Sequence, residues 1–141
     1  MKTKTVLLSA ILLVSTSAFA ASPTVKYVTV NHSTALLLDK DAAAVIWTES
    51  IPGKVAKAYS PKKWGFLTAV EGGFTKDNTC VVSASVMLLP LGVNGKTLLF
   101  KPVKTTSTFD ALPAATKDKC TELARSKLKE AIHAMIAALG G

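Results

Sequence analysis

Residues 64–91 read WGFLTAVEGGFTKDNTCVVSASVMLLPL, and this stretch decides the fold. It contains two runs rich in aromatic and β-branched residues, Trp64–Thr75 and Cys80–Leu91, which are typical of the two strands of a β-hairpin. Successive side chains of a strand point to opposite faces, so the parity of the residue number sorts them. The even positions of the second run are all apolar, whereas its odd positions include two serines. The even face is therefore the predicted core face.

The length of the hairpin loop determines which residues of the two strands pair. A two-residue turn at Asp77–Asn78 would pair Phe74 with Val81 and mix the even and odd sets. A three-residue loop, Lys76–Asn78, pairs Phe74 with Cys80 and keeps both even sets on one face. Such a loop ends in a left-handed residue, a conformation that Asn tolerates well. The sequence therefore predicts the three-residue loop.

A Gly-Gly pair interrupts the first strand of the hairpin. Glycine weakens a strand and often marks either a bulge or a point where another backbone approaches closely. We therefore expect one of these two features at Gly72–Gly73.

The C-terminal part of the chain predicts the longest helix, Pro113–Leu139. Proline suits the first turn of a helix, and Gly140–Gly141 would end it. At 100° per residue the apolar positions form one stripe, which should pack across the even face of the sheet. Lys127 interrupts this stripe; either its stem covers apolar surface while its ammonium reaches water, or it makes a salt bridge or a ligand contact. The predicted core of sheet and helix comprises Trp64, Phe66, Val70, Phe74, Val82, Val86, Leu88, Leu123, Leu128, Ile132, Met135 and Leu139.

Two further strands complete the predicted sheet. Thr24–Val30 is a short strand near the start of the chain, and Lys96–Lys104 is a third strand of the meander. Pro102 cannot donate a ladder hydrogen bond, so the third strand should lie at the sheet edge. Thr105–Asp110 is then a polar connector to the final helix.

The segment between the first strand and the hairpin predicts one or two short helices. Residues 35–50 suit either a helix or a strand, and we favour a helix at Ala42–Ser50 with Asp39 or Asp41 as its N-cap. Pro52–Tyr59 predicts a second short helix. The predicted fold class is thus α+β: an antiparallel β-meander of about four strands packed by a long C-terminal helix.

The first 20 residues have the parts of a secretory signal peptide. Two lysines precede an apolar run, Val6–Val14, and Ala18–Ala20 forms a small-x-small cleavage site. The apolar run is too short for a transmembrane helix. We therefore expect residues 1–20 to be cleaved and residues 21–141 to form a single domain, periplasmic or secreted, without a transmembrane segment. Loss of the two lysines lowers the formal net charge from +8 to +6.

The chain has two cysteines, Cys80 and Cys120. In an exported chain two cysteines favour a disulfide over a metal or redox site. Cys80 lies on the even face of the hairpin, and Cys120 lies on the apolar stripe of the final helix. Two independent patterns thus place both sulfurs in the same interior and predict a Cys80–Cys120 disulfide; no metal and no cofactor is predicted.

One segment combines positive charge with aromatic rings. Its candidate binding residues are Lys54, Lys57, Tyr59, Lys62, Lys63 and Trp64. This composition suits an anionic envelope component or an acidic protein partner. The alternative is that the lysines only keep the surface hydrated and the two rings belong to the core. On a helix Lys54 and Lys57 share a face, whereas Lys62 and Lys63 join them together only if the Ser60–Pro61 bend redirects both.

The sequence favours binding over catalysis. His133 falls on the outer face of the final helix, and His32 lies in a polar loop beside Ser33 and Thr34, which leaves a small hydrolase as a minor alternative. We therefore predict an exported, non-enzymatic binding or partner protein, inhibitor-like or accessory, with no catalytic residues. The other alternative is a small-ligand carrier with an apolar pocket between the sheet and the C-terminal helix. No groove-reading motif for nucleic acid is present, so no nucleic-acid partner is expected.

Overall fold

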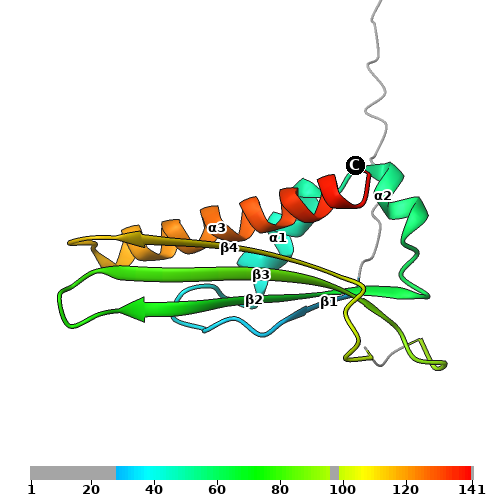
Figure 1. Ribbon diagram of the computed structural model, residues 1–141, viewed down its shortest axis with the longest axis horizontal. Helices are drawn as coiled ribbons and strands as arrows, with labels where there is room; N and C mark the ends of the chain where they lie inside the picture. The colour runs from blue at the N-terminus through cyan, green and yellow to red at the C-terminus, as the bar shows by residue number, and fades with distance from the viewer. Residues whose placement is uncertain (1–27, 96–98, 141) are drawn as a thin grey trace, which may run out of the picture.

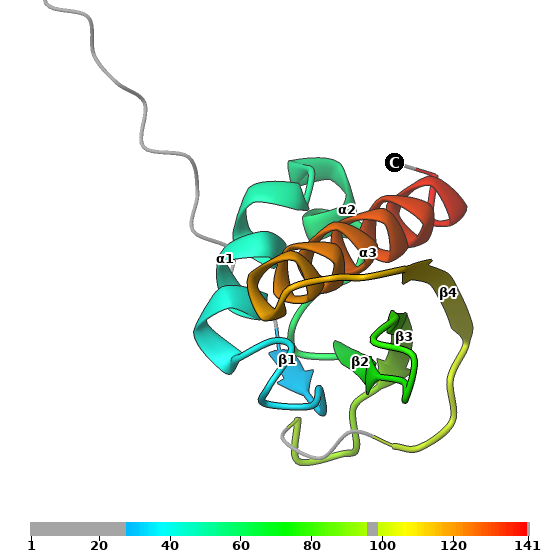
Figure 2. The same cartoon turned by 90° about the vertical axis from the view of Figure 1, so that its left-hand side faces the viewer.

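A four-stranded sheet and three helices make up the part of the chain that the computed structural model describes, residues 28–95 and 99–140. All three helices lie on one side of the sheet, and the other side carries no helix (Figures 1 and 2). None of the described helices is both long and apolar enough to cross a membrane. The elements in chain order are β1 (Val28–Asn31), α1 (Lys40–Ser50), α2 (Gly53–Ala58), β2 (Trp64–Phe74), β3 (Cys80–Pro90), β4 (Lys104–Leu112) and α3 (Lys117–Ala138).

The strand order is β1-β2-β3-β4, so β1 and β4 form the edges of the sheet. The α+β class is confirmed, and β2, β3 and β4 form the expected antiparallel meander. The prediction that the whole sheet is antiparallel is wrong, because β1 pairs parallel to β2. The chain passes through α1 and α2 between these strands, and a helical crossover of this kind joins parallel strands. Of the predicted first strand, residues 24–27 lie outside the described residues.

The central hairpin has the predicted register. Phe74 pairs with Cys80, and every residue of β2 faces a residue of β3 with the same parity. The N–H of Thr75 donates to the carbonyl of Thr79 across 2.9 Å, which leaves the three-residue loop between them. Asn78 closes that loop in the left-handed conformation, with a φ of 55°. The local turn chemistry therefore sets the pairing of the whole hairpin.

Gly72 is a point of close backbone approach, one of the two features predicted there. The register continues without a bulge through Gly72 and Gly73, which pair with Val82 and Val81. Gly72 has a φ of 141°, and a Cβ built on it would collide with the carbonyl oxygen of Val81. Only glycine fits at this position.

The two short helices form close to where they were predicted. The ambiguous residues 35–50 contain α1, and its N-cap is Asp39, whose carboxylate accepts a hydrogen bond from the N–H of Ala42 at 2.7 Å. In α2 the predicted first residue, Pro52, acts as the N-cap instead. A side-chain cap thus fixes the start of α1, whereas Pro52 makes no side-chain cap hydrogen bond at the start of α2.

The start of α3 differs from the predicted Pro113. The helix begins at Lys117, because the hydroxyl of Thr116 caps it by accepting from the N–H of Lys119 at 3.3 Å. Ala114 has a φ of 49°, which no residue inside an α-helix adopts. Pro113 thus belongs to the turn that leads from β4 into the helix.

The core lies between the even face of the sheet and helices α1 and α3. Trp64, Leu123 and Leu139 pack at its margin and are half-buried. Phe74 is 46% exposed, so its assignment to the core is wrong: it ends β2 beside an open groove. The fully enclosed members of the predicted core are Phe66, Val70, Val82, Val86, Leu88, Leu128, Ile132 and Met135.

Trp47 of α1 joins the helix layer to the sheet. Its ring is 3% exposed and lies 4.7 Å from the ring of Phe66, measured between centroids. Its indole N–H donates to the hydroxyl of Thr68 at 2.9 Å, which satisfies a polar pair that is buried in an apolar core.

The predicted disulfide is present. Cys80 begins β3 and Cys120 lies in the first turn of α3; both are buried, and their Cα atoms are 5.6 Å apart. The bridge closes a loop with a sequence separation of 40, which in the loop-entropy account stabilises the fold by about 4 kcal/mol. It also holds the start of α3 over the even face of the sheet.

The predicted third strand of the meander is wrong. The strand that occupies this place is β4, Lys104–Leu112, which includes the whole of the predicted connector Thr105–Asp110. Of the predicted strand Lys96–Lys104, residues 96–98 lie outside the described residues. The third meander strand does form an edge of the sheet, as expected, but from the following segment of the chain.

Threonines explain why a polar segment forms β4. The hydroxyls of Thr106 and Thr108 donate to the backbone carbonyls of Ala131 and Lys127 in α3, each at 2.8 Å. The strand therefore packs on the helix through hydrogen bonds as well as apolar contact. A search for alternating apolar residues does not detect such a strand.

Lys127 strengthens the same contact between β4 and α3. Its side chain is 13% exposed, and its ammonium lies 3.1 Å from the carboxylate of Asp110 and 2.8 Å from that of Glu130. The salt-bridge interpretation of this lysine is therefore confirmed. The hydrogen bonds to Glu130 and then to Asp110 raise the pKa of Lys127. The N–H of Ala111 and then Lys127 lower the pKa of Asp110.

The first prediction concerns Gly72. Gly72→Ala should lower the free energy of unfolding by roughly 2 kcal/mol or more, because the new methyl group collides with the backbone of β3. Gly53→Ala is the matched control, since a Cβ at Gly53 meets no atom within 4 Å. Urea unfolding of both variants measures the difference. Equal stabilities would contradict the close approach.

The second prediction concerns the pH dependence of the β4–α3 contact. The pKa of Asp110 is lowered from 3.8, so its ionised form stabilises the fold above that value, and this contribution disappears as the pH falls through the lowered pKa. Asp110→Asn should therefore be less stable than the wild type at neutral pH, and the two should converge in strong acid. Urea unfolding across acid pH measures this, with Asp77→Asn in the exposed hairpin loop as the control. An undiminished difference in strong acid would rule out the ionic contribution.

Candidate interaction surface

The predicted basic segment lies at the end of the molecule opposite the hairpin loop (Figure 1). Lys54 and Lys57 are exposed on α2, three residues apart. Lys62 and Lys63 are exposed in the connection to β2. The N–H of Lys63 donates to the carbonyl of Ser60 at 2.9 Å, so the connection is a tight turn. The four lysines thus occupy neighbouring exposed segments.

The two aromatic rings of this segment have a different role. Tyr59 and Trp64 are half-buried and pack against the core, with their rings 5.9 Å apart in an edge-to-face arrangement. They belong to the core margin, as the alternative interpretation stated. The lysines are the accessible part of the segment.

A second segment, missed in the sequence analysis, lies beside the basic one. It is the β3–β4 connection, of which residues 91–95 and 99–103 are described. The N–H of Leu91 donates to the carbonyl of Lys63 at 2.8 Å, and the N–H of Leu99 donates to the carbonyl of Pro90 at 2.9 Å. The connection therefore packs along the entry to β2, on the side of the sheet away from the helices (Figure 1).

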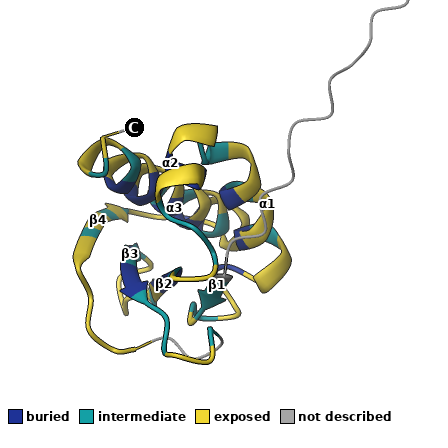
Figure 3. Ribbon diagram, turned by 90° about the vertical axis from the view of Figure 1, so that its right-hand side faces the viewer, coloured by how far each residue is buried: buried dark blue, intermediate teal, exposed yellow. Residues whose placement is uncertain are grey.

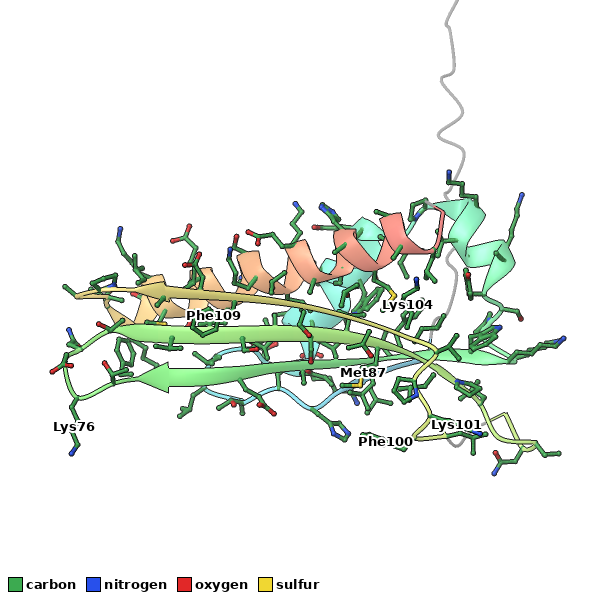
Figure 4. The ribbon with its side chains drawn as sticks, in the orientation of Figure 1. Lys76, Met87, Phe100, Lys101, Lys104 and Phe109 are labelled. Atoms are coloured by element: carbon green, nitrogen blue, oxygen red, sulfur yellow. A yellow bond between two sulfur atoms is a disulfide. The ribbon has the colours of Figure 1, made fainter. Side chains whose placement is uncertain are left out.

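This connection exposes large apolar side chains. Val93 is fully exposed, Phe100 is 81% exposed and Val103 is 62% exposed. Phe100 and the exposed Lys101 lie on the helix-free side of the sheet (Figure 4). Figure 3, which faces this end of the molecule, shows α2 and the connection as largely exposed. We call this surface the basic-apolar end and define it by Lys54, Lys57, Lys62, Lys63, Val93, Leu99, Phe100, Lys101 and Val103.

Few acids lie near the lysines of the basic-apolar end in the sequence. Residues 50–70 and 78–109 include no aspartate or glutamate, and the exposed Glu49 lies five residues before Lys54. The opposite end has charges of both signs: Lys76 and Asp77 are exposed in the hairpin loop. Charge is therefore distributed unevenly along the molecule.

The sequence does hold a signal for this surface. The run Leu99–Val103 is apolar, basic and proline-containing, and no acid lies near it. The predicted strand Lys96–Lys104 implied that these apolar residues pack in a sheet, whereas they are exposed.

A small apolar groove lies at the other end of the helix layer. Its volume is about 240 Å³, and Leu36, Phe74, Lys117 and Cys120 are among its lining residues. Pockets for small organic ligands usually measure about 300–1,000 Å³. Beneath the length of α3 the space is instead filled by side chains of the core, which are fully buried. The groove therefore gives the small-ligand carrier little support.

The two histidines, which were the candidates for acid–base chemistry, lie at the surface. His32 and His133 are both exposed. The hydroxyl beside His32, that of Ser33, accepts a hydrogen bond from the N–H of Val70 at 2.9 Å and so braces β2. Among the described residues, no group of three or more His, Cys, Asp or Glu side chains lies close enough to hold a metal ion.

Comparisons with known proteins find limited similarity. No protein-family model and no curated protein matches the chain. A leucine-to-methionine variant of the PelC dodecamer from Paraburkholderia phytofirmans is similar in structure, with a TM-score of 0.44, 13% identity, and coverage of 80% of this chain and 90% of that chain. A second structure of that dodecamer gives a TM-score of 0.39 and 12% identity over 76% of this chain and 84% of that chain. At these values the likeness assigns this chain to no family and to no function.

Proposed function

We propose that this protein is an exported, non-enzymatic binding protein that contacts its partner through the basic-apolar end. The observation that carries the proposal is the exposure of Val93, Phe100 and Val103 beside a group of exposed lysines. Single exposed apolar residues are ordinary, but several large ones in one connection beside charged residues mark an interaction surface. The proposal rests on this surface and not on a lack of catalytic groups.

The two kinds of residue at this end have complementary roles. Exposed lysines attract an anionic partner over distances of about 10 Å at 0.1 M salt and orient it during approach. Apolar side chains then supply contact energy by leaving water, which long-range attraction does not provide. A surface that has both is suited to association with an anionic partner.

Export fits this role. The N-terminal 20 residues have the pattern of a cleaved signal, and the buried Cys80–Cys120 disulfide is consistent with an oxidising compartment. The proposed partner is therefore a component of the cell envelope or of the exterior.

The test measures retention on isolated envelopes. The protein is expressed as the full chain and carries no affinity tag. A tag at either terminus would lie close to the tested surface, because β1 begins and α3 ends near the basic-apolar end (Figure 1). We expect it to sediment with envelopes at low salt and to be released at high salt, since salt screens the lysines. The charge variant Lys62→Ser/Lys63→Ser/Lys101→Ser should lose retention without a change in melting temperature, because all three side chains are exposed.

The control replaces three exposed lysines of α3. Lys117→Ser/Lys119→Ser/Lys129→Ser removes the same net charge away from the basic-apolar end and should leave retention intact. An equal loss of envelope retention in both triple variants would show that retention depends only on the net charge of the protein. Full retention of the charge variant would show that this end is not the binding surface.

A further inference from the structure

We infer that the partner of the basic-apolar end is the surface of an anionic phospholipid bilayer, into which the side chains of Val93 and Phe100 insert. This inference rests on the proposed function, because it names the partner of the same surface.

The shape of the apolar side chains favours a lipid partner over a folded protein. Val93 and Phe100 project from the β3–β4 connection with almost all of their surface in water. A folded protein would need matching pockets to bury such protruding side chains. The interfacial region of a bilayer closes around them without any preformed shape.

Lysines lie next to the connection that carries the inserting side chains. Lys101 follows Phe100 directly in the chain, and Lys62 and Lys63 belong to the turn that the connection packs against. Lysine stems can lie along apolar surface while their ammoniums reach headgroup phosphates. Stable membrane association generally needs two signals, and this end combines apolar insertion with a basic patch.

Backbone hydrogen bonds hold the inserting segment in place. Besides the bonds at Leu91 and Leu99, the N–H of Val103 donates to the carbonyl of Leu88 at 2.9 Å. The connection is thus tied to the sheet at both of its ends. Because the bonds of Leu99 and Val103 hold Phe100 and Lys101 beside the sheet before contact, ordering these two residues on binding loses less conformational entropy.

The position of the basic-apolar end also determines the orientation. With the basic-apolar end toward the bilayer, the hairpin loop at Lys76 lies farthest from it (Figure 4). Asp77 sits in that loop, so its carboxylate is kept away from the anionic surface. The reverse orientation would present this carboxylate to the lipid phosphates and would leave Phe100 in water.

The test uses purified protein and vesicles of defined lipids, with flotation as the readout. The expected result is binding to phosphatidylglycerol-containing vesicles, weak binding to phosphatidylcholine vesicles, and release as salt shortens the screening length from about 30 Å at 0.01 M to about 3 Å at 1 M. The charge variant Lys62→Ser/Lys63→Ser/Lys101→Ser should bind on the order of a hundredfold more weakly. The α3 control, Lys117→Ser/Lys119→Ser/Lys129→Ser, should bind like the wild type.

A second pair of variants tests insertion. Val93→Ser/Phe100→Ser should bind on the order of a hundredfold more weakly, because the apolar contribution is lost. Leu36→Ser/Val45→Ser removes two exposed apolar side chains elsewhere and should bind normally. In Phe100→Trp, vesicles with brominated acyl chains should quench a fluorescence component that the wild type lacks.

The outcomes separate this inference from the proposed function. Absence of binding to anionic vesicles, unchanged binding of Val93→Ser/Phe100→Ser, or an unquenched Phe100→Trp would each overturn the lipid inference. If the charge variant still loses envelope retention in that case, the partner is an anionic envelope component other than the lipid bilayer and the proposed function stands. If envelopes do not retain the wild type either, both fail.

Discussion

The burial of one face of the sheet is the constraint on which the rest of the structure depends. The Cys80–Cys120 bridge ties the first residue of β3 to the first turn of α3, so the helix must cover the face to which Cys80 points. A slip of one residue in the hairpin would turn its apolar set toward water. The three-residue loop that ends at Asn78 prevents that slip by pairing Phe74 with Cys80. Loop, register and disulfide are thus mutually consistent.

Polar contacts, in addition to apolar ones, complete the edge of the sheet. Thr106 and Thr108 bond to carbonyls of α3, and Lys127 bridges Asp110 and Glu130 at the same margin. These interactions satisfy the groups that face the helix, so a strand of mostly polar residues can close the core. The other side of the sheet carries none of the described helices (Figure 2).

The proposed binding surface follows from the same pairing. Trp64 pairs with Pro90, which brings the start of β2 and the end of β3 to one end of the molecule. The basic turn that precedes Trp64 and the apolar connection that follows Pro90 therefore meet, although they are separated by the whole hairpin in the sequence. Because no acid lies in either segment, the combined surface carries positive charge beside exposed apolar side chains. This combination is the basis for proposing an anionic, deformable partner.

The sequence by itself determined the features that depend on local periodicity. Residue parity identified the buried face and the hairpin register, and helical periodicity placed Cys120 toward Cys80. A capping signal located α1, and Pro52 together with helical periodicity located α2. The tertiary structure decided the rest. The parallel pairing of β1, the strand at Lys104–Leu112 and the exposure of Phe100 depend on partners that are distant in the sequence. Alternating apolar residues predict a strand with one apolar face, whereas β4 is mostly polar. It is held by its pairing with β3 and by hydrogen bonds from Thr106 and Thr108 to carbonyls of α3.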